Sequence, residues 1–294
     1  MKRTAFIAIV GRPNVGKSTL LNSLLGEKVS MVSSKPQTTR NRITGILSSG
    51  DDQYVFLDTP GVHRPHNKLG EFMDKTALSA LSDSDIAILT VEAGDKVGPT
   101  ERNIIDQIRS GGMHSILVIN KTDVSTPEKI AETIRMFSEY YSFDAVVPIC
   151  AKKNDGTDIV LKEASAFLTE HEWFFPEGIF TDQPERQYAA EVIREKLLRT
   201  LDKEVPHGTA VMIEDFKDEE SIIRIRAEIF CEKDSHKGII VGKNGETLKT
   251  IGTRAREDLE LFFGTKVYLN LWVKVKRNWR DSEANITNFG YTMD

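Results

Sequence analysis

The sequence predicts an α/β protein: a doubly wound, mostly parallel sheet followed by a smaller α+β domain. Over the first 170 residues, short apolar runs alternate with helical patterns. A polar stretch containing prolines and a glycine then interrupts this alternation. Beyond it the patterns follow the order helix, strand, strand, helix, helix, strand. This change of element order predicts two domains of different class.

The predicted strands of the first domain are apolar runs bounded by polar residues, Gly or Pro, as expected for strands buried on both faces. They cover residues 6–10, 54–57, 86–91, 116–119 and 146–149. Helical patterns between them cover residues 17–25, 100–110, 127–141 and 158–170. Because ligands bind at the carboxyl ends of parallel strands, the loops that follow these runs are the expected site.

The interruption is punctuated by Pro176, Gly178 and Pro184, which favour a linker. We therefore predict a first domain over 1–175, a linker over 176–184 and a second domain over 185–294. The second domain's elements are a helix over 185–201, strands over 209–216 and 222–231, helices flanking 242–245, and a strand over 267–275.

Composition limits the class of protein. Hydrophobic residues make up 39% of the 294 positions and charged residues 28%, which is typical of a globular chain rather than a disordered one. Two distant cysteines, Cys150 and Cys231, exclude a disulfide scaffold and predict a reducing, cytoplasmic location. The apolar run over 5–10 is too short for a membrane span, and no small-residue cleavage site follows it.

A phosphate-binding loop is the strongest motif. Residues 11–18 read Gly-Arg-Pro-Asn-Val-Gly-Lys-Ser and match G-x-x-x-x-G-K-[ST] between a predicted strand and a predicted helix. The alternative, a glycine-rich turn with no ligand, lacks that context. Lys17 is expected at the β and γ phosphates, and the Ser18 hydroxyl at Mg²⁺. The sheet is thus predicted to be of the P-loop NTPase type, and its expected nucleotide contacts are Gly11, Arg12, Pro13, Asn14, Val15, Gly16, Lys17, Ser18 and Thr19.

The base is predicted from Asn120-Lys121-Thr122-Asp123, which follows the strand over 116–119. A carboxylate at Asp123 can accept hydrogen bonds from guanine N1–H and its exocyclic amine, and adenine lacks those donors. Asn120 is expected to tie loops together, and Lys121 to lie along the base. After the last strand, the Ala151 N–H of Cys150-Ala151-Lys152 is expected at guanine O6. The predicted ligand is GTP or GDP.

Two further loops complete the predicted site. Asp58-Thr59-Pro60-Gly61 follows a strand, so Asp58 is placed to hold Mg²⁺ through water and the Gly61 N–H to meet the γ-phosphate. In the polar loop before it, Thr39 is the expected second hydroxyl on the metal, with Thr38 as the alternative. The predicted catalytic set is Lys17, Thr39, Asp58 and Gly61, and the predicted metal ligands are Ser18, Thr39 and Asp58.

The residue after Gly61 affects the expected rate. Many GTPases orient the attacking water with a Gln there, whereas this chain has Val62. We therefore expect slow intrinsic turnover, with the water positioned by backbone, another residue or a partner. Asn14 leaves two interpretations open: it holds a K⁺ ion, as in some GTPases with Asn at this position, or it only stabilises the loop.

The second domain carries Gly242-Lys243-Asn244-Gly245 between two helical segments, the turn with which KH domains clamp single-stranded RNA. Alone, Gly-x-x-G is more often a plain connection between helices. Three features favour a type II KH domain: the element order, a basic window over 233–280 with eleven Lys and Arg against five Asp and Glu, and an apolar groove expected beside the turn from Ile239, Ile240, Val241, Leu248 and Ile251. The predicted RNA-binding residues are Lys237, Gly242, Lys243, Asn244 and Gly245; Trp272 is expected in the core rather than as a stacking surface.

The ordered motifs resemble the bacterial Era family of translation-associated GTPases. They are the loop over 11–18, Gln-Thr-Thr-Arg at 37–40, Asp-Thr-Pro-Gly at 58–61, Asn-Lys-Thr-Asp at 120–123, Ile-Arg-Glu-Lys-Leu at 193–197, Gly-Lys-Asn-Gly at 242–245 and Leu-Trp-Val-Lys-Val-Lys at 271–276. Cys150 departs from the family's usual Ser, with little expected consequence because residue 151 contacts the base through its backbone.

This resemblance implies slow hydrolysis of GTP to GDP and phosphate with Mg²⁺, binding near the 3′ end of 16S rRNA through the KH domain, and a role in 30S subunit assembly. It also implies peripheral association with the inner face of the cell membrane, which no feature of the sequence requires. We expect a monomer. Two alternatives remain: an RNA-binding assembly factor with negligible turnover, and a P-loop ATPase or kinase, which Asn120 and Asp123 disfavour.

Overall fold

The computed structural model describes residues 1–292, and the chain divides into two compact units. The first comprises Met1–Val32, Thr39–Pro65 and Gly70–Asp182. The second begins at Gln183 and also includes two short segments from the N-terminal half, Ser33–Thr38 and His66–Leu69. The division at Gln183 lies within the stretch predicted as a linker.

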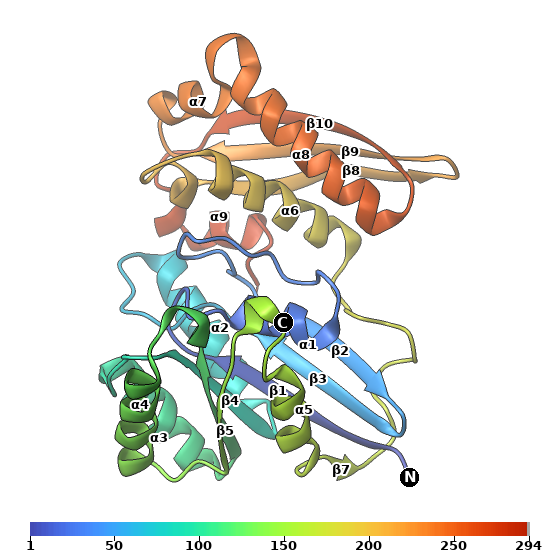
Figure 1. The fold of residues 1–294 in the computed structure, drawn as a ribbon. Helices are drawn as coiled ribbons and strands as arrows, with labels where there is room; N and C mark the ends of the chain where they lie inside the picture. The colour runs from blue at the N-terminus through green and yellow to red at the C-terminus, as the bar shows by residue number, and fades with distance from the viewer. Residues whose placement is uncertain (293–294) are drawn as a thin grey trace. The chain divides into compact units, whose positions relative to one another are not determined.

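A mostly parallel sheet forms the first unit, in the order β2-β3-β1-β4-β5-β6 (Figure 1). Its strands are β1 (Arg3–Val10), β2 (Ile43–Ser49), β3 (Asp52–Asp58), β4 (Ile86–Glu92), β5 (His114–Asn120), β6 (Ala145–Pro148) and β7 (Thr169–Glu170). Two pairings are antiparallel, β2 with β3 and β7 with β1. The predicted fold class is confirmed.

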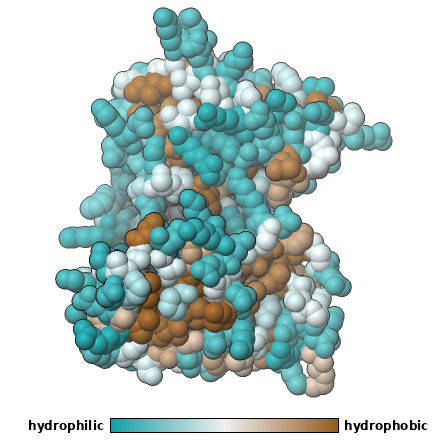
Figure 2. Space-filling view, viewed as in Figure 1, coloured by the Kyte–Doolittle hydropathy of each residue, from teal (hydrophilic) through white to brown (hydrophobic). Residues whose placement is uncertain are grey.

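Helices pack on both faces of this sheet because alternate side chains of each strand point to opposite faces. Ile7 and Ile9 belong to one core with α1 and α5, whereas Ala8 and Val10 belong to another with α2, α3 and α4. These helices are α1 (Lys17–Leu25), α2 (Lys68–Ser82), α3 (Pro99–Gly111), α4 (Pro127–Tyr140) and α5 (Thr157–Ser165). Figure 2 shows brown apolar patches within the otherwise hydrophilic visible face of this unit.

Some elements differ from the sequence prediction. The strand β2 and the helix α2 were not predicted, and the expected helix over 158–170 ends at Ser165, after which β7 pairs with β1. Polar Thr44, Ser48 and Ser49 interrupt the apolar pattern of β2, which is an edge strand of the sheet.

The second unit is a three-stranded sheet in the order β10-β9-β8 with α6 and α8 packed on it (Figure 1). Its elements are α6 (Glu185–Thr200), β8 (Ala210–Glu219), β9 (Ile222–Cys231), α7 (Asp234–Val241), α8 (Glu246–Phe263), β10 (Lys266–Val275) and α9 (Glu283–Asn288). Strands β8 and β9 are antiparallel, and β10 is parallel to β9. The order from α6 to β10 is the one predicted.

The prediction that Trp272 lies in the core is wrong. Its side chain is 58% exposed, because alternate positions of β10 turn away from the helices while neighbouring Val273 is buried. The buried tryptophan of this unit is Trp279, which donates from Nε1 to the carbonyl of Gly208 at 2.9 Å. Within residues 1–292, we find no helix with the length and apolar character needed to span a bilayer.

Candidate functional site

The phosphate loop runs from the end of β1 to the start of α1. Gly11 and Gly16 have φ of 147° and 100°, and a Cβ on Gly16 would lie 2.2 Å from the Asn120 amide nitrogen. Glycine is therefore required there by both conformation and space. The Lys17 ammonium donates to the carbonyls of Gly11 (3.1 Å) and Arg12 (2.8 Å), and burial lowers the pKa of Lys17 to about 8.

A cluster of oxygen atoms lies beside this loop, at the end of β3. Ser18 Oγ is 2.6 Å from Asp58 Oδ2 and 2.9 Å from Thr39 Oγ1. Ser30 Oγ also donates to Asp58 Oδ2, at 2.7 Å. Burial raises the pKa of Asp58, and the hydroxyls of Ser18, Ser30 and Thr39 together with the Lys17 ammonium act to lower it. The three residues predicted as metal ligands are thus together, whereas the alternative Thr38 hydroxyl donates to Lys35 O at 2.8 Å.

This cluster fits a hard divalent cation. Asp58 Oδ1 is buried and accepts no hydrogen bond, although buried carboxylate oxygens are normally satisfied. Hydroxyl and carboxylate oxygens are the donors that Mg²⁺ prefers, with water and phosphate completing its shell. Within the described residues, no group of three or more His, Cys, Asp and Glu could hold a metal. The cluster around Asp58 is a metal-binding candidate because of its own donors, two hydroxyls and a carboxylate with one unpartnered oxygen.

The loop after β3 approaches the phosphate loop closely. A Cβ on Gly61 would lie 2.5 Å from the backbone nitrogen of Pro13, and the Val62 amide donates to Gly11 O at 3.2 Å. Thr59 donates from its hydroxyl to Ile9 O at 2.8 Å, which ties this loop to β1. The Val62 side chain is buried in the core with Val10 and Leu89.

Asn120 connects three loops through its side-chain amide. Its Nδ2 donates to Val15 O at 2.9 Å, while its Oδ1 accepts from the Lys121 amide at 2.8 Å and from the Ala151 amide at 3.1 Å. The expectation that Asn120 joins loops is matched by these contacts. The Ala151 N–H, which we expect at guanine O6 when nucleotide is bound, donates to Asn120 Oδ1 in the structure.

Asp123 and Lys121 flank this connection. The pKa of Asp123 is held below its usual value, mainly by a hydrogen bond from the Cys150 thiol and to a smaller extent by Lys153. The Lys153 ammonium is 3.4 Å from the Asp123 carboxylate. The Lys121 ammonium donates to Asn14 O at 2.7 Å and pairs with Glu92. The four residues predicted around the base, Asn120, Lys121, Asp123 and Ala151, thus lie at neighbouring strand ends.

Sequence reasoning missed three partners of these motifs. Ser30 binds Asp58, Lys153 pairs with Asp123, and the buried Glu101 of α3 pairs with the Arg12 guanidinium. Only Lys153 carried a local signal, since it follows the Cys150-Ala151-Lys152 motif directly. Ser30 and Glu101 are brought in by packing, because they lie far in sequence from the groups they contact.

The Gly-x-x-G turn of the second unit joins α7 to α8. Gly242 has φ of 73° and Gly245 has φ of 81°, and a Cβ on Gly242 would lie 2.2 Å from Thr247 Oγ1. Lys237, Lys243 and Asn244 are exposed around this turn.

A hollow of about 440 Å³ lies beside the turn between α8 and β10. Its lining includes Leu248, Lys249, Arg256, Tyr268 and Asn270. The predicted apolar groove is only partly correct, because Ile240 and Ile251 are fully buried core residues, while Leu248 does line the hollow. The hollow therefore combines apolar and basic side chains next to backbone that only glycine can form.

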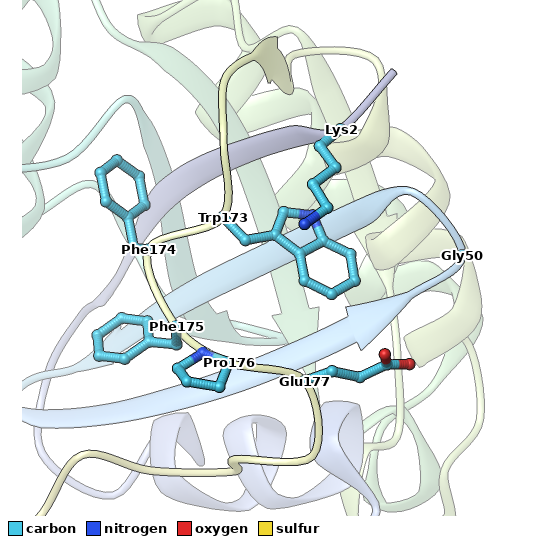
Figure 3. A pocket seen from close by; sticks show the side chains of 7 residues that line it. All are labelled: Lys2, Gly50, Trp173, Phe174, Phe175, Pro176 and Glu177. Atoms are coloured by element: carbon cyan, nitrogen blue, oxygen red, sulfur yellow. The ribbon is translucent and has the colours of Figure 1, made fainter.

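A different hollow, of about 500 Å³, lies in the first unit away from these motifs (Figure 3). Its lining is the segment Trp173 to Glu177 together with Lys2 and Gly50. Figure 3 shows the Lys2 side chain reaching over the Trp173 ring, where its ammonium is 4.8 Å from the ring centroid. The Trp173 indole also donates to Asp51 O at 3.1 Å, so Trp173 contacts both Lys2 near the N-terminus and the turn between β2 and β3.

Comparison with known proteins gives matches to both units. Residues 6–121 match the model of a family described as 50S ribosome-binding GTPase, and residues 204–280 match the KH domain model. A protein named GTPase Era from Clostridioides difficile is 48% identical over 294 residues, covering 99% of both chains. GTPase Era from Ruminiclostridium cellulolyticum is 46% identical, covering 98% of this chain and 97% of the relative.

Two solved structures match the whole chain. One is a variant of Aquifex aeolicus Era bound to GDP and AlF4⁻, with a TM-score of 0.95 and 38% identity, covering 99% of this chain and 100% of that one. The other is Era in complex with MgGDPNP and nucleotides 1506–1542 of 16S ribosomal RNA, with a TM-score of 0.94, 38% identity and full coverage of both chains.

Proposed function

The chain belongs to the Era family of GTPases, and from that premise we propose that it is a GTP-controlled RNA-binding protein of small-subunit assembly. In this proposal the first unit binds and hydrolyses GTP with Mg²⁺. The second unit binds 16S ribosomal RNA of the 30S subunit. The Gly242–Gly245 turn beside a basic, apolar-lined hollow is the observation that supports RNA binding most directly.

In the nucleotide site, each motif has a role that its contacts support. Ser18, Thr39 and Asp58 would hold Mg²⁺, which neutralises charge that develops on the phosphates. Lys17 lies at the start of α1, where an ammonium and the helix N-terminus both favour phosphate oxygens. The Gly61 N–H contacts the γ-phosphate, and the Asp123 carboxylate accepts hydrogen bonds from the guanine edge.

Slow intrinsic turnover follows from the burial of Val62. This side chain packs into the core and has no polar atom, so it cannot orient a water molecule. The attacking water is then positioned by backbone groups or by a bound partner. We also propose that Asn14, an exposed loop residue with φ of 66°, holds a K⁺ ion. Equal hydrolysis rates in K⁺ and Na⁺ at one ionic strength would end that assignment.

Charge reversal at the turn tests the RNA-binding part. Lys243→Glu places a carboxylate where phosphates approach, so its affinity for an RNA copy of 16S nucleotides 1506–1542 should fall at least about tenfold. Lys217→Glu makes the same charge change on β8, at the other edge of the sheet from β10, and should leave RNA affinity within about twofold. Binding of GDP should be unchanged in both variants. Equal RNA affinity in Lys243→Glu and wild type would refute the assignment of the turn.

A further inference from the structure

We propose that Ser30 is a positioning residue for the Mg²⁺ site: its buried hydroxyl holds one oxygen of the Asp58 carboxylate and leaves the other oxygen for the metal. This inference rests on the proposed function, because that function assigns the cluster around Asp58 to Mg²⁺. Ser30, Asp58 and the residues of α1 that contact them all lie in the first unit.

Ser30 is a polar residue in an otherwise apolar buried segment. It lies in the loop after α1, between the buried residues Val29 and Met31, and its own side chain is 0% exposed. An alanine would fill nearly the same space without a hydroxyl, which needs a hydrogen-bond partner when it is buried. The partner in this fold is Asp58, whose Oδ2 accepts from Ser30 Oγ at 2.7 Å. The carboxylate at position 58 therefore accounts for the hydroxyl at position 30.

The side-chain amide of Asn22 fixes the backbone that carries this hydroxyl. Its Oδ1 accepts from the Val29 amide at 3.0 Å and from the Ser30 amide at 2.9 Å. Its Nδ2 donates to Ser30 O at 2.7 Å, so both backbone polar groups of Ser30 are bound to one side chain. Asn22 belongs to α1, the helix that begins at Lys17 and also contains Ser18. Ser30 is thus held to the same helix as the phosphate-binding lysine and the first predicted metal ligand.

The two oxygens of the Asp58 carboxylate have different surroundings. Oδ2 accepts from Ser18 Oγ at 2.6 Å and from Ser30 Oγ at 2.7 Å, and these two bonds use both lone pairs of that oxygen. Oδ1 is buried and has no hydrogen-bond partner within the described residues. Two donors on one oxygen restrict rotation of the carboxylate, so the position of Oδ1 is restricted as well. Oδ1 is then the oxygen left to bind Mg²⁺ or a water molecule of its shell.

Ser30 differs from the predicted metal ligands in the contacts that it makes. Ser18 Oγ lies 2.9 Å from Thr39 Oγ1, so these two hydroxyls are adjacent within the metal cluster. Ser30 instead has its backbone bound to Asn22 and its hydroxyl bound to Asp58, and it acts on the metal only through that carboxylate. Groups that hydrogen-bond to a metal-binding side chain orient it, and their removal typically weakens metal affinity about 10- to 100-fold.

The test measures the Mg²⁺ requirement of the full chain bound to a fluorescent, non-hydrolysable GTP analogue. Mg²⁺ should slow release of the analogue, and the Mg²⁺ concentration that gives half of this slowing should rise at least about tenfold in Ser30→Ala. In EDTA, the Kd for the analogue should stay within about twofold of wild type, because the phosphate and base loops are intact. In the Asp58→Asn background, Ser30→Ala should cause no further change, since Ser30 acts through that carboxylate.

Ser115→Ala is the matched control. Ser115 is 1% exposed and donates from Oγ to Asp144 Oδ2 at 3.5 Å, but it lies near the start of β5, at the end away from Asn120. Its Mg²⁺ requirement should equal that of wild type. A Ser30→Ala protein with a lower Tm and the wild-type Mg²⁺ requirement would show that the hydroxyl only stabilises the fold, and would overturn the inference. A wild-type chain that binds no guanine nucleotide, or binds it with no effect of Mg²⁺, would instead overturn the proposed function, and this inference with it.

Discussion

Replacing Asn120 by Ala should weaken the nucleotide site strongly although it removes only a small side chain. Asn120→Ala deletes three hydrogen bonds at once: the donation to Val15 O and the two donations received from the Lys121 and Ala151 amides. Each neutral hydrogen bond contributes roughly 1 kcal/mol net to stability. Two of the partners, Val15 O and the Ala151 N–H, are in buried bonds, and leaving such groups unsatisfied costs roughly 1–3 kcal/mol each.

Counting about 1 kcal/mol for the bond with the Lys121 amide and roughly 1–3 kcal/mol for each of the two buried groups left unsatisfied, the expected loss in free energy of unfolding for Asn120→Ala is about 3–7 kcal/mol, which is large for a single polar side chain. GDP affinity should also fall by at least about tenfold, because the phosphate loop and both base loops lose their common contact. Urea unfolding of nucleotide-free protein measures the first quantity, and competition against fluorescent GDP the second. Ser23→Ala, which removes one exposed hydrogen bond to Asn154, is the control and should change stability by less than about 0.5 kcal/mol.

A loss below about 1 kcal/mol in Asn120→Ala, with unchanged GDP affinity, would refute this reasoning. It would mean that the three loops are held by other contacts, and that the amide of Asn120 is replaceable by water.

Three other predictions concern separate parts of the chain. Trp279→Ala removes a fully buried indole and its bond to Gly208, and urea unfolding should show a loss of about 4 kcal/mol. The hydrogen bond to Asp74 raises the pKa of His63, so Asp74→Asn should lower it, as followed by NMR titration. Because the pKa of His63 is raised in the folded state, the stabilisation from this pair is fully present below about pH 6.5 and is lost as the pH rises through the pKa of folded His63. The difference in free energy of unfolding between wild type and Asp74→Asn should therefore shrink as the pH rises through that range. Chelation of Mg²⁺ with EDTA should weaken binding of a GTP analogue more than binding of GDP, and Asp58→Asn should remove that dependence on Mg²⁺.

The predicted nucleotide motifs were found close together because they follow predictable elements. The phosphate loop begins directly after β1, and Asp58 and Asn120 are the last residues of β3 and β5, strands with unbroken apolar runs. Parallel strands bring those ends to one edge of the sheet. Periodicity alone therefore places the loops, and the motif residues identify the chemistry.

Periodicity does not identify elements or partners whose role depends on packing. The edge strand β2 contains Ser48, Ser49 and Thr44, so it lacks the apolar run that marks its neighbours.

The helix α2 was missed for a different reason, because its sequence does carry a helical pattern. Its buried residues Leu69, Met73, Ala77 and Leu81 follow one another at helical spacing, so periodicity was sufficient to predict this helix.

The two tryptophans illustrate the same limit in the second unit. Trp272 and Trp279 are chemically identical, yet one is exposed on the open side of β10 and the other is fully buried. Which face of a strand meets the helices is a property of the assembled sheet rather than of the residue. Likewise, no local pattern links Arg194 to Gln37, and only the structure brings these distant segments together.

In the function proposed for this protein, the nucleotide bound by the first unit sets the RNA affinity of the second. The direct measurement is the Kd of the full chain for an RNA copy of 16S nucleotides 1506–1542, taken with Mg²⁺ and either a non-hydrolysable GTP analogue or GDP. Coupling between two sites in one protein is typically about 5- to 150-fold, and we predict RNA binding about tenfold tighter with the analogue. Equal RNA affinity in the two nucleotide states would contradict the claim.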